Sequence, residues 1–323
     1  MSTSQSLHQL FNNVSSKIIG QEILVKRLLI ALLADGHLLV EGAPGLAKTR
    51  AIKVLSSCID GDFQRIQFTP DLLPADLTGT DIFRPQEGTF KFQPGPLFHN
   101  LILADEINRA PAKVQSALLE AMGERQITVG STTYHLPDMF LVMATQNPIE
   151  QEGTHPLPEA QLDRFLMLIR IDYPNYESER QILQLVRKEV LTNRDDYTPA
   201  EEEAIDKETI FAARQEVLDL HMSENLETYL IQIIMATREP NVLGGKYSNI
   251  IQYGASPRAT IALDRCARAN AWLEGRDFVT PEDIQSLAYD VLRHRILLTF
   301  EAEAEGITTD HLISKLLAAV PVP

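Results

Sequence analysis

The segment Gly42–Thr49, which reads Gly-Ala-Pro-Gly-Leu-Ala-Lys-Thr, constrains this chain more than any other. It follows the apolar run Leu38–Val40 and precedes a stretch with helical spacing. In loops of this kind, backbone N–H groups converge on a phosphate, the lysine neutralises charge, and the last hydroxyl binds Mg²⁺. We therefore expect this loop to hold a nucleoside triphosphate through the following residues: Gly42, Ala43, Pro44, Gly45, Leu46, Ala47, Lys48 and Thr49.

Two features of the loop leave room for a simpler interpretation. Ala47 stands where the pattern has glycine, and a methyl group is tolerated there only if φ is negative. A Gly/Pro turn between a strand and a helix also produces part of this pattern. Assignment to phosphate binding therefore needs a second motif.

The second motif is Leu101–Glu106, an apolar run that ends in two carboxylates. Buried parallel strands read as continuous apolar runs, and ligands gather at their carboxyl ends. Because side chains alternate along a strand, adjacent acids point in different directions and serve different roles. We assign Asp105 to the Mg²⁺ that Thr49 also binds, and Glu106 to the water that attacks the γ-phosphate. Alone, the acid pair would also fit the first turn of a helix.

A third apolar run, Met139–Ala144, is followed by Thr145, Gln146 and Asn147. An amide can donate to a phosphate oxygen and accept from a water at the same time. Asn147 is therefore a candidate sensor of the γ-phosphate, although an Asn-Pro pair also opens ordinary turns.

Taken together and in this order, the motifs resemble those of AAA+ ATPases, and within them the MoxR group. The resemblance covers most of the chain and is carried by these segments: Ile18–Gln21, Gly42–Thr49, Leu103–Ala110, Ala144–Pro148, Glu159–Phe165 and Ser256–Ala259. It implies an α/β fold, in which a P-loop AAA+ αβα sandwich with a parallel sheet is followed by a smaller all-helical lid domain.

The resemblance also implies roles for residues outside the three motifs. Arg164 resembles the arginine finger, which reaches the γ-phosphate of a neighbouring subunit, and a guanidinium suits that role through its forked donors. Arg258 resembles the sensor-2 arginine and is expected to close the lid over the nucleotide. Its place just after the helix-starting pair Ser256-Pro257 opposes the helix dipole by about 0.3–1 kcal/mol, which suggests a compensating anion. Ile18 and Ile19 are expected beside the adenine.

Helix and strand signals alternate up to residue 172, and helical periodicity dominates over 173–323. The expected nucleotide-binding domain, 1–172, contains an insertion over 63–100 and a β-hairpin over 126–137 that turns at Gly130-Ser131. The insertion is either a surface excursion packed by its own side chains or a partner contact, with Phe90, Phe92 and Leu97 as candidate anchors. The hairpin resembles one that projects towards the pore of a ring.

Composition bounds the partners of the chain. A net charge of −15 argues against a broad nucleic-acid footprint, and no stretch of this 323-residue sequence approaches a membrane span. Cys58 and Cys266 are expected to be reduced and buried, in a cytoplasmic protein. The family resemblance implies ATP and Mg²⁺ as cofactors, a homo-oligomeric ring, expected to be a hexamer, and a client protein containing a von Willebrand factor A domain.

The predicted function is a Mg²⁺-dependent ATPase that remodels or activates a protein partner, as in the maturation of metalloenzymes or other complexes. A DNA-directed AAA+ motor shares every nucleotide motif but should carry a basic hairpin, and residues 130–135 contain no lysine or arginine. A nucleotide-binding switch with little hydrolysis is a further alternative, against which Glu106 argues.

Overall fold

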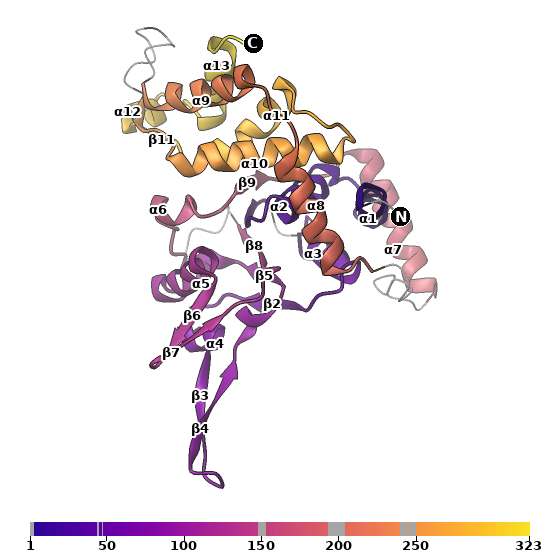
Figure 1. Ribbon diagram of the computed structural model, residues 1–323, viewed down its shortest axis with the longest axis vertical. Coiled ribbons are helices and arrows are strands. Elements are labelled where there is room, and N and C mark those ends of the chain that lie inside the picture. The colour runs from indigo at the N-terminus through magenta and orange to yellow at the C-terminus, as the bar shows by residue number, and fades with distance from the viewer. Residues whose placement is uncertain are drawn as a thin grey trace.

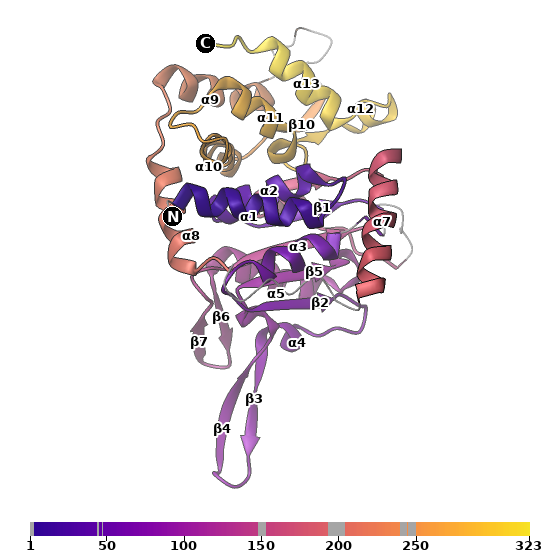
Figure 2. The ribbon, with the colours of Figure 1, turned by 90° about the vertical axis from the view of Figure 1, so that its right-hand side faces the viewer.

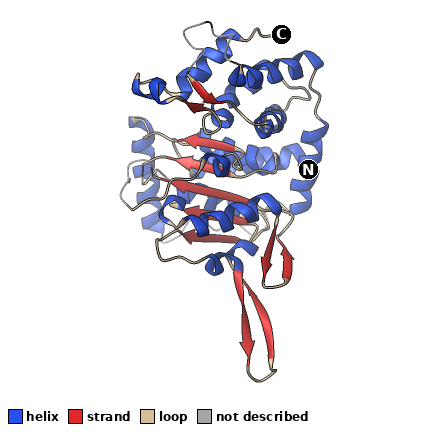
Figure 3. Cartoon of the chain, turned by 90° about the vertical axis from the view of Figure 1, so that its left-hand side faces the viewer, coloured by secondary structure: helices blue, strands red, loops and turns tan. Residues whose placement is uncertain are grey.

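The fold is built on a five-stranded parallel sheet. The computed structural model describes residues 3–43, 45–46, 48–147, 153–192, 204–239, 244 and 250–323. The strands lie in the order β2-β5-β8-β1-β9, and all four neighbouring pairs are parallel (Figure 3). Their bounds are Leu38–Glu41 for β1, Phe63–Gln67 for β2, Leu101–Asp105 for β5, Leu141–Gln146 for β8 and Met167–Arg170 for β9.

Helices cover both faces of this sheet. Leu38 and Val40 of β1 lie in one core with α1 (Thr3–Lys17), α2 (Glu22–Leu33) and α3 (Lys48–Ser57), whereas Leu39 faces a second core with α5 (Ala112–Glu124). Successive residues of an extended strand point to opposite faces, so each strand supplies both cores. Figure 2 shows α1, α2 and α3 on one side of the sheet. The αβα sandwich predicted from the sequence is thereby confirmed.

The predicted insertion over 63–100 begins too early. Residues 63–67 form β2, which pairs with β5 from Phe63 opposite Leu101 to Gln67 opposite Asp105. This edge strand was missed because only Ile66 among its five residues is buried, so it lacks an apolar run. The remainder forms α4 (Pro74–Thr78), a hairpin of β3 (Gly79–Arg84) and β4 (Thr89–Pro94), and the short 3-10 helix η1 (Pro96–Phe98).

Two hairpins project from the same part of the molecule, away from the C-terminal helices (Figure 1). The predicted hairpin is confirmed as β6 (Gln126–Val129) and β7 (Thr132–His135), and Gly130 in its turn has φ of +60°. Its Tyr134 stacks on Phe92 of the β3–β4 hairpin, with ring centroids 4.0 Å apart. Of the expected anchors, Leu97 is fully buried, but Phe90 is 69% exposed and its ring packs on Phe83 of the same hairpin, with centroids 5.2 Å apart.

The C-terminal part is a helical lid made of α9 (Glu224–Arg238), α10 (Pro257–Leu273), α11 (Pro281–Leu292), α12 (Phe300–Ala304) and α13 (Thr309–Ala319). It also holds a two-stranded sheet, β10 (Ile251–Tyr253) with β11 (Leu297–Leu298), which the helical periodicity did not predict. Thr280 and Asp283 form a capping box at the start of α11, as the Thr-Pro-Glu-Asp sequence there favours.

The first helices after residue 172 lie beside the sheet domain and not within the lid (Figures 1 and 2). These are α7 (Tyr176–Thr192) and α8 (Lys207–Asp219), and α8 packs against α1 and α2 as well as α10. The division at 172 remains a proposal. Cys58 and Cys266 are free and buried, as expected. Within the described ranges, no helix is long and apolar enough to cross a membrane.

Candidate active site

The three predicted motifs meet in one cleft at the carboxyl ends of β1, β5 and β8. The cleft has a volume of about 390 Å³. Its predicted members are Gly45, Leu46, Lys48, Thr49, Asp105, Glu106 and Asn147, and Arg50, Lys53 and Thr145 complete the lining. Pro44 and Ala47 of the predicted loop lie outside the described residues. Segments about 60 and 100 positions apart in sequence thus converge on one site.

The N-terminus of α3 is arranged to receive an anion. Lys48 begins the helix, and its Nζ donates to the carbonyl oxygen of Gly42 at 2.7 Å. Partial burial lowers the pKa of Lys48, while the carboxylates of Asp105 and Glu106 act in the opposite direction. Helix N-terminal N–H groups and a lysine together favour phosphate. Gly42 is needed for space, because a Cβ there would lie 2.4 Å from Ile171 Cγ1.

Asp105 and Glu106 are oriented through Thr145, which the sequence did not single out. The Thr145 hydroxyl donates to Asp105 Oδ1 at 2.6 Å and accepts from the backbone N–H of Glu106 at 3.0 Å. Glu106 has φ of 57° and ψ of 50°, a left-handed conformation that is uncommon outside glycine. The divergence of the two acids therefore comes from this turn as well as from strand alternation.

Each carboxylate has further partners, two of them on the unpredicted strand β2. Arg65 donates to Asp105 Oδ2 through Nη2 at 2.6 Å, and Gln67 Nε2 donates to Glu106 Oε2 at 2.8 Å. Arg109 also pairs with Glu106 Oε2, at 3.2 Å. If residues 63–67 had been predicted as a strand next to β5, Arg65 and Gln67 could have been expected at the carboxyl edge of the sheet, beside the two acids.

Ile18 and Ile19 do not line this cleft. Ile18 is buried in the core beneath α1 and α2, and Ile19 is partly buried. The segment lies near the phosphate loop, because Arg50 Nε of α3 donates to the carbonyl oxygen of Lys17 at 3.1 Å. Contact of these two residues with adenine remains a proposal.

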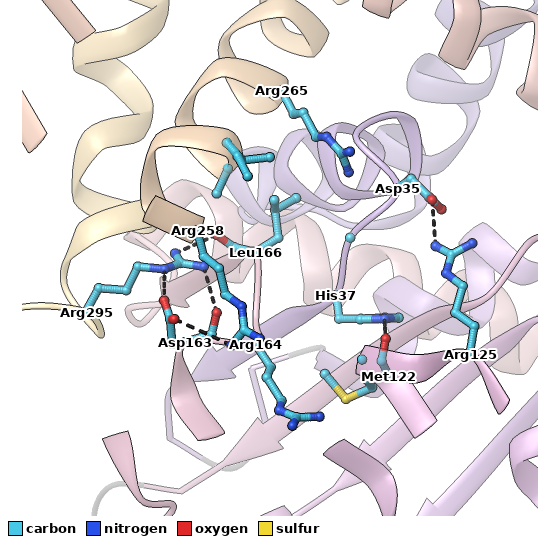
Figure 4. Close-up of a pocket in the computed structure, with 14 residues that line it drawn as sticks. Asp35, His37, Met122, Arg125, Asp163, Arg164, Leu166, Arg258, Arg265 and Arg295 are labelled. Carbon is cyan, nitrogen blue, oxygen red and sulfur yellow. Dashed lines mark hydrogen bonds and ion pairs between the residues drawn. The ribbon is translucent and has the colours of Figure 1, made fainter. Parts of the chain in front are cut away.

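Arg164 and Arg258 lie in a second pocket, of about 320 Å³ (Figure 4). The pocket is formed by residues that precede β1 and β9, by the end of α5 and by the first turns of α10, so it lies at the amino edge of the sheet. Its lining residues are Asp35, Gly36, His37, Met122, Gly123, Arg125, Asp163, Arg164, Leu166, Arg258, Ile261, Ala262, Arg265 and Arg295. The expectation that Arg258 closes the lid over the nucleotide of its own chain is not met. The packing of the lid places Arg258 at the amino edge of the sheet, opposite the phosphate loop. No short segment of the sequence encodes this packing.

The second pocket is rich in positive charge. Five arginines line it, against the carboxylates of Asp35 and Asp163. Arg164 Nη1 donates to the carbonyl oxygen of Leu119. The absence of a side chain at Gly123 leaves space for the Arg164 guanidinium, since a Cβ on Gly123 would lie 2.7 Å from Nη1. Such a surface attracts anions such as phosphates.

Comparison with known proteins agrees with this architecture. The family profile described as "ATPase family associated with various cellular activities (AAA)" matches residues 37–167, and "AAA lid domain" matches 248–316. Chaperone MoxR1 of Mycobacterium tuberculosis is 44% identical over 320 residues, covering 98% of this chain and 82% of that protein. Protein MoxR of Methylorubrum extorquens is 32% identical over 326 residues, covering 96% and 93%.

The fold comparison points the same way. The crystal structure of a candidate ATPase from Cytophaga hutchinsonii superposes with a TM-score of 0.91 at 47% identity, covering 99% of this chain and 96% of that one. Fold, cleft and both profile matches place the chain among the AAA+ ATPases. It binds nucleotide and hydrolyses ATP. Because its similarity to MoxR proteins spans most of both chains, it belongs to the MoxR family.

Proposed function

We propose that the chain is a Mg²⁺-dependent ATPase that acts as a closed ring, expected to be a hexamer, and that each active site is completed by a neighbouring subunit. One observation carries this proposal. The phosphate loop follows β1, whereas Arg164 and Arg258 lie at the edge where β1 begins. The four residues of β1 separate the two edges by roughly 13 Å. The two arginines therefore face another subunit more readily than their own cleft.

Within the cleft, the chain's residues divide the work of phosphoryl transfer. Lys48 and the N-terminus of α3 bind the phosphates, Glu106 orients the attacking water, and Asn147 contacts the γ-phosphate. Oxygen ligands suit Mg²⁺, and the Thr49 hydroxyl and the Asp105 carboxylate, which line the same cleft, would hold it. The metal would neutralise charge on the β and γ oxygens. Asp105 Oδ2 would then exchange its bond with Arg65, whose side chain is 46% exposed.

The completion of the site between subunits is tested by mixing variants. Arg164→Ala should assemble and bind ATP with unchanged affinity but turn over about 1,000-fold more slowly or worse, because an arginine finger contributes roughly 10³–10⁵ to kcat. Glu106→Gln should bind ATP without turnover. Mixed rings should recover part of the activity, since intact fingers of Glu106→Gln subunits complete the clefts of Arg164→Ala subunits. Light scattering on the same samples gives the assembled mass.

One control accompanies the mixing experiment. Lys48→Ala should abolish ATP binding, so rings of this variant alone should not turn over. If Arg164→Ala alone retains full turnover, or if activity per subunit does not depend on assembly, the interfacial site is wrong.

We further propose that the ring remodels a client with a von Willebrand factor A domain, in keeping with the name chaperone borne by a relative. The β3–β4 hairpin supports a partner contact, since its Ile82, Phe83 and Phe90 are 44%, 50% and 69% exposed. Charge does not favour DNA: residues 79–94 carry Asp81, Arg84, Glu87 and Lys91, which sum to zero, and residues 126–137 carry no lysine or arginine. The protein-directed function is therefore preferred over a DNA motor.

The client proposal is tested with a purified von Willebrand factor A domain protein from the same organism and with duplex DNA as the competing ligand. ATP-loaded Glu106→Gln rings should retain the protein and not the DNA at physiological salt. Phe83→Ser with Phe90→Ser should weaken retention at least tenfold. The matched control is Phe300→Ser, which replaces an 80% exposed aromatic residue on the lid. This variant should retain the client as well as the Glu106→Gln ring does. Retention of DNA alone would favour the motor.

A further inference from the structure

The loop that carries Arg164 is held by a buried arginine of the lid. We call residues 163–166 the finger loop. Arg295 follows α11, and its side chain is only 2% exposed. Its guanidinium donates to Asp163 Oδ1 at 2.8 Å and to three finger-loop carbonyl oxygens: Asp163 at 3.2 Å, Phe165 at 2.6 Å and Leu166 at 3.0 Å. Most donors of this guanidinium are thus used on one four-residue segment.

Asp163 joins two of the arginines of the second pocket, Arg295 and Arg258. While its Oδ1 accepts from Arg295, its Oδ2 accepts from the Ser256 hydroxyl at 2.8 Å and lies 3.6 Å from Arg258 Nη1 (Figure 4). Ser256 is also the N-cap of α10, where it accepts from the backbone N–H of Arg258. The carboxylate therefore binds the start of α10 and Arg295 at the same time, and Arg164 is its direct neighbour in the chain.

Other contacts besides this buried charge pair attach the lid to the sheet domain. Arg293, two residues before Arg295, donates to the carbonyl oxygen of Leu168 in β9 at 2.8 Å. It also pairs with Asp290 and Asp310 within the lid. Arg27 of α2 also pairs with Asp290, at 2.7 Å. Burying a guanidinium and a carboxylate carries a desolvation cost that often cancels their attraction. The role that we consider for this pair is therefore the geometry that it imposes.

We propose that Asp163 and Arg295 are positioning residues that fasten the finger loop to the lid, so that Arg164 and Arg258 are presented to the neighbouring subunit's triphosphate as one rigid unit. This inference rests on the proposed interfacial site. Because the pair spans the lid and the loop, any rotation of the lid moves both arginines together. The site of one subunit then responds to the lid position of the next.

The test uses the full-length ring with Asp163→Asn, which keeps the shape of the side chain and removes its charge. We expect kcat to fall at least tenfold, while ATP affinity stays within twofold because the variant's own cleft is intact. The assembled mass should be that of the unmodified ring. Mixing with Glu106→Gln subunits should restore turnover, since their intact finger loops complete the Asp163→Asn clefts. A purely structural role would not produce rescue by a catalytically dead partner.

Asp310→Asn is the matched control. It breaks lid ion pairs with Arg170 and Arg293 but touches no finger-loop atom, so turnover should stay within twofold of the unmodified ring. Arg295→Lys, which keeps the charge and loses the forked donors, is the second variant and should repeat both the loss and the rescue. If both variants fail to assemble with Glu106→Gln subunits, the pair serves folding alone and the proposal is overturned.

The outcomes separate this inference from the function on which it rests. If Arg164→Ala is not rescued by Glu106→Gln subunits, the finger does not act between subunits and the proposed function fails. Suppose that Arg164→Ala is rescued. If Asp163→Asn then turns over normally, or if its turnover falls and is not rescued by Glu106→Gln subunits, only the positioning role fails. Equal impairment by Asp310→Asn and Asp163→Asn would likewise overturn it.

Discussion

At the scale of single residues, the acids of the cleft depend on groups that hold them. Asp105 and Glu106 were predicted from an apolar run that ends in carboxylates, a signal contained within six residues. Thr145, which bonds to both, lies about 40 positions away and became a neighbour only because β5 and β8 pair. A threonine at the end of a strand carries no local mark of such a role.

We predict that Thr145→Val lowers turnover about tenfold or more. It removes the donor to Asp105 Oδ1 and leaves the N–H of Glu106, in its left-handed conformation, without that acceptor, a loss of about 1–3 kcal/mol for a buried polar group. Thr145→Ser keeps the hydroxyl and should retain most activity. The measurement is ATP turnover at saturating nucleotide, with the urea midpoint recorded for each variant. Equal rates for the valine and serine variants would contradict this role.

At the scale of elements, prediction succeeded where the signal was local and failed where it was not. The hairpin at Gly130-Ser131 and the cap at Ser256 were each found from a few adjacent residues. The edge strand β2 was missed because its exposed side chains leave no apolar run. The β3–β4 hairpin was recognised only as part of the insertion over 63–100.

We predict that two glycines of this hairpin differ sharply in their tolerance of alanine. Gly79 has φ of +90°, and a Cβ there would lie 2.2 Å from the carbonyl oxygen of Gln93, whereas Gly88 has φ of +64° and open space around it. Gly88→Ala should cost only the left-handed backbone term of about 1–2 kcal/mol. Gly79→Ala adds a clash with backbone and should unfasten the base of the hairpin.

Limited proteolysis within residues 79–95 measures this difference. Cleavage should be much faster in Gly79→Ala than in Gly88→Ala or the unmodified chain, at matched temperature and salt. If the two variants are cut at the same rate, the close approach at Gly79 does not hold the hairpin.

At the scale of the whole molecule, the amino edge of the sheet depends on a neutral histidine. His37 Nδ1 accepts from the backbone N–H of Val142 at 3.1 Å, and Nε2 lies 3.3 Å from the carbonyl oxygen of Met122. These partners suit the tautomer with its proton on Nε2. Burial, with a contribution from nearby Arg125, lowers the pKa of His37 from 6.5 to about 4. His294 is also buried, and burial lowers its pKa well below the usual value.

We predict that acid weakens the fold between pH 6.5 and 4. In this window the unfolded chain protonates His37 while the folded chain does not, so the unfolded state binds more protons and stability falls as pH falls. From pH 7 to 5, His37 alone should remove about 2 kcal/mol from the free energy of unfolding. Urea unfolding at both pH values measures the change, and His294 adds to it.

His37→Gln is the matched variant for the acid effect, because an amide can accept from Val142 and donate to Met122 without titrating. Its unfolding free energy should vary less between pH 7 and 5 than that of the unmodified chain. An identical pH dependence in the two proteins would rule out His37 as a source of the effect. The pKa of the buried Asp283 carboxyl is lowered, so its contribution to the free energy of unfolding is lost only as the pH approaches the ordinary aspartate value of 3.8 and falls below it.

The sequence by itself determined the phosphate loop, the acidic strand, the αβα class and the helix starts, because each depends on side chains within a few positions of one another. Only the tertiary structure decided the place of β2, the contacts of Arg65, Gln67 and Thr145 with the acids, and the position of Arg164 and Arg258 at the edge opposite the phosphate loop. Those features follow from strand order and from how the lid packs on the sheet, and no short segment encodes either of these.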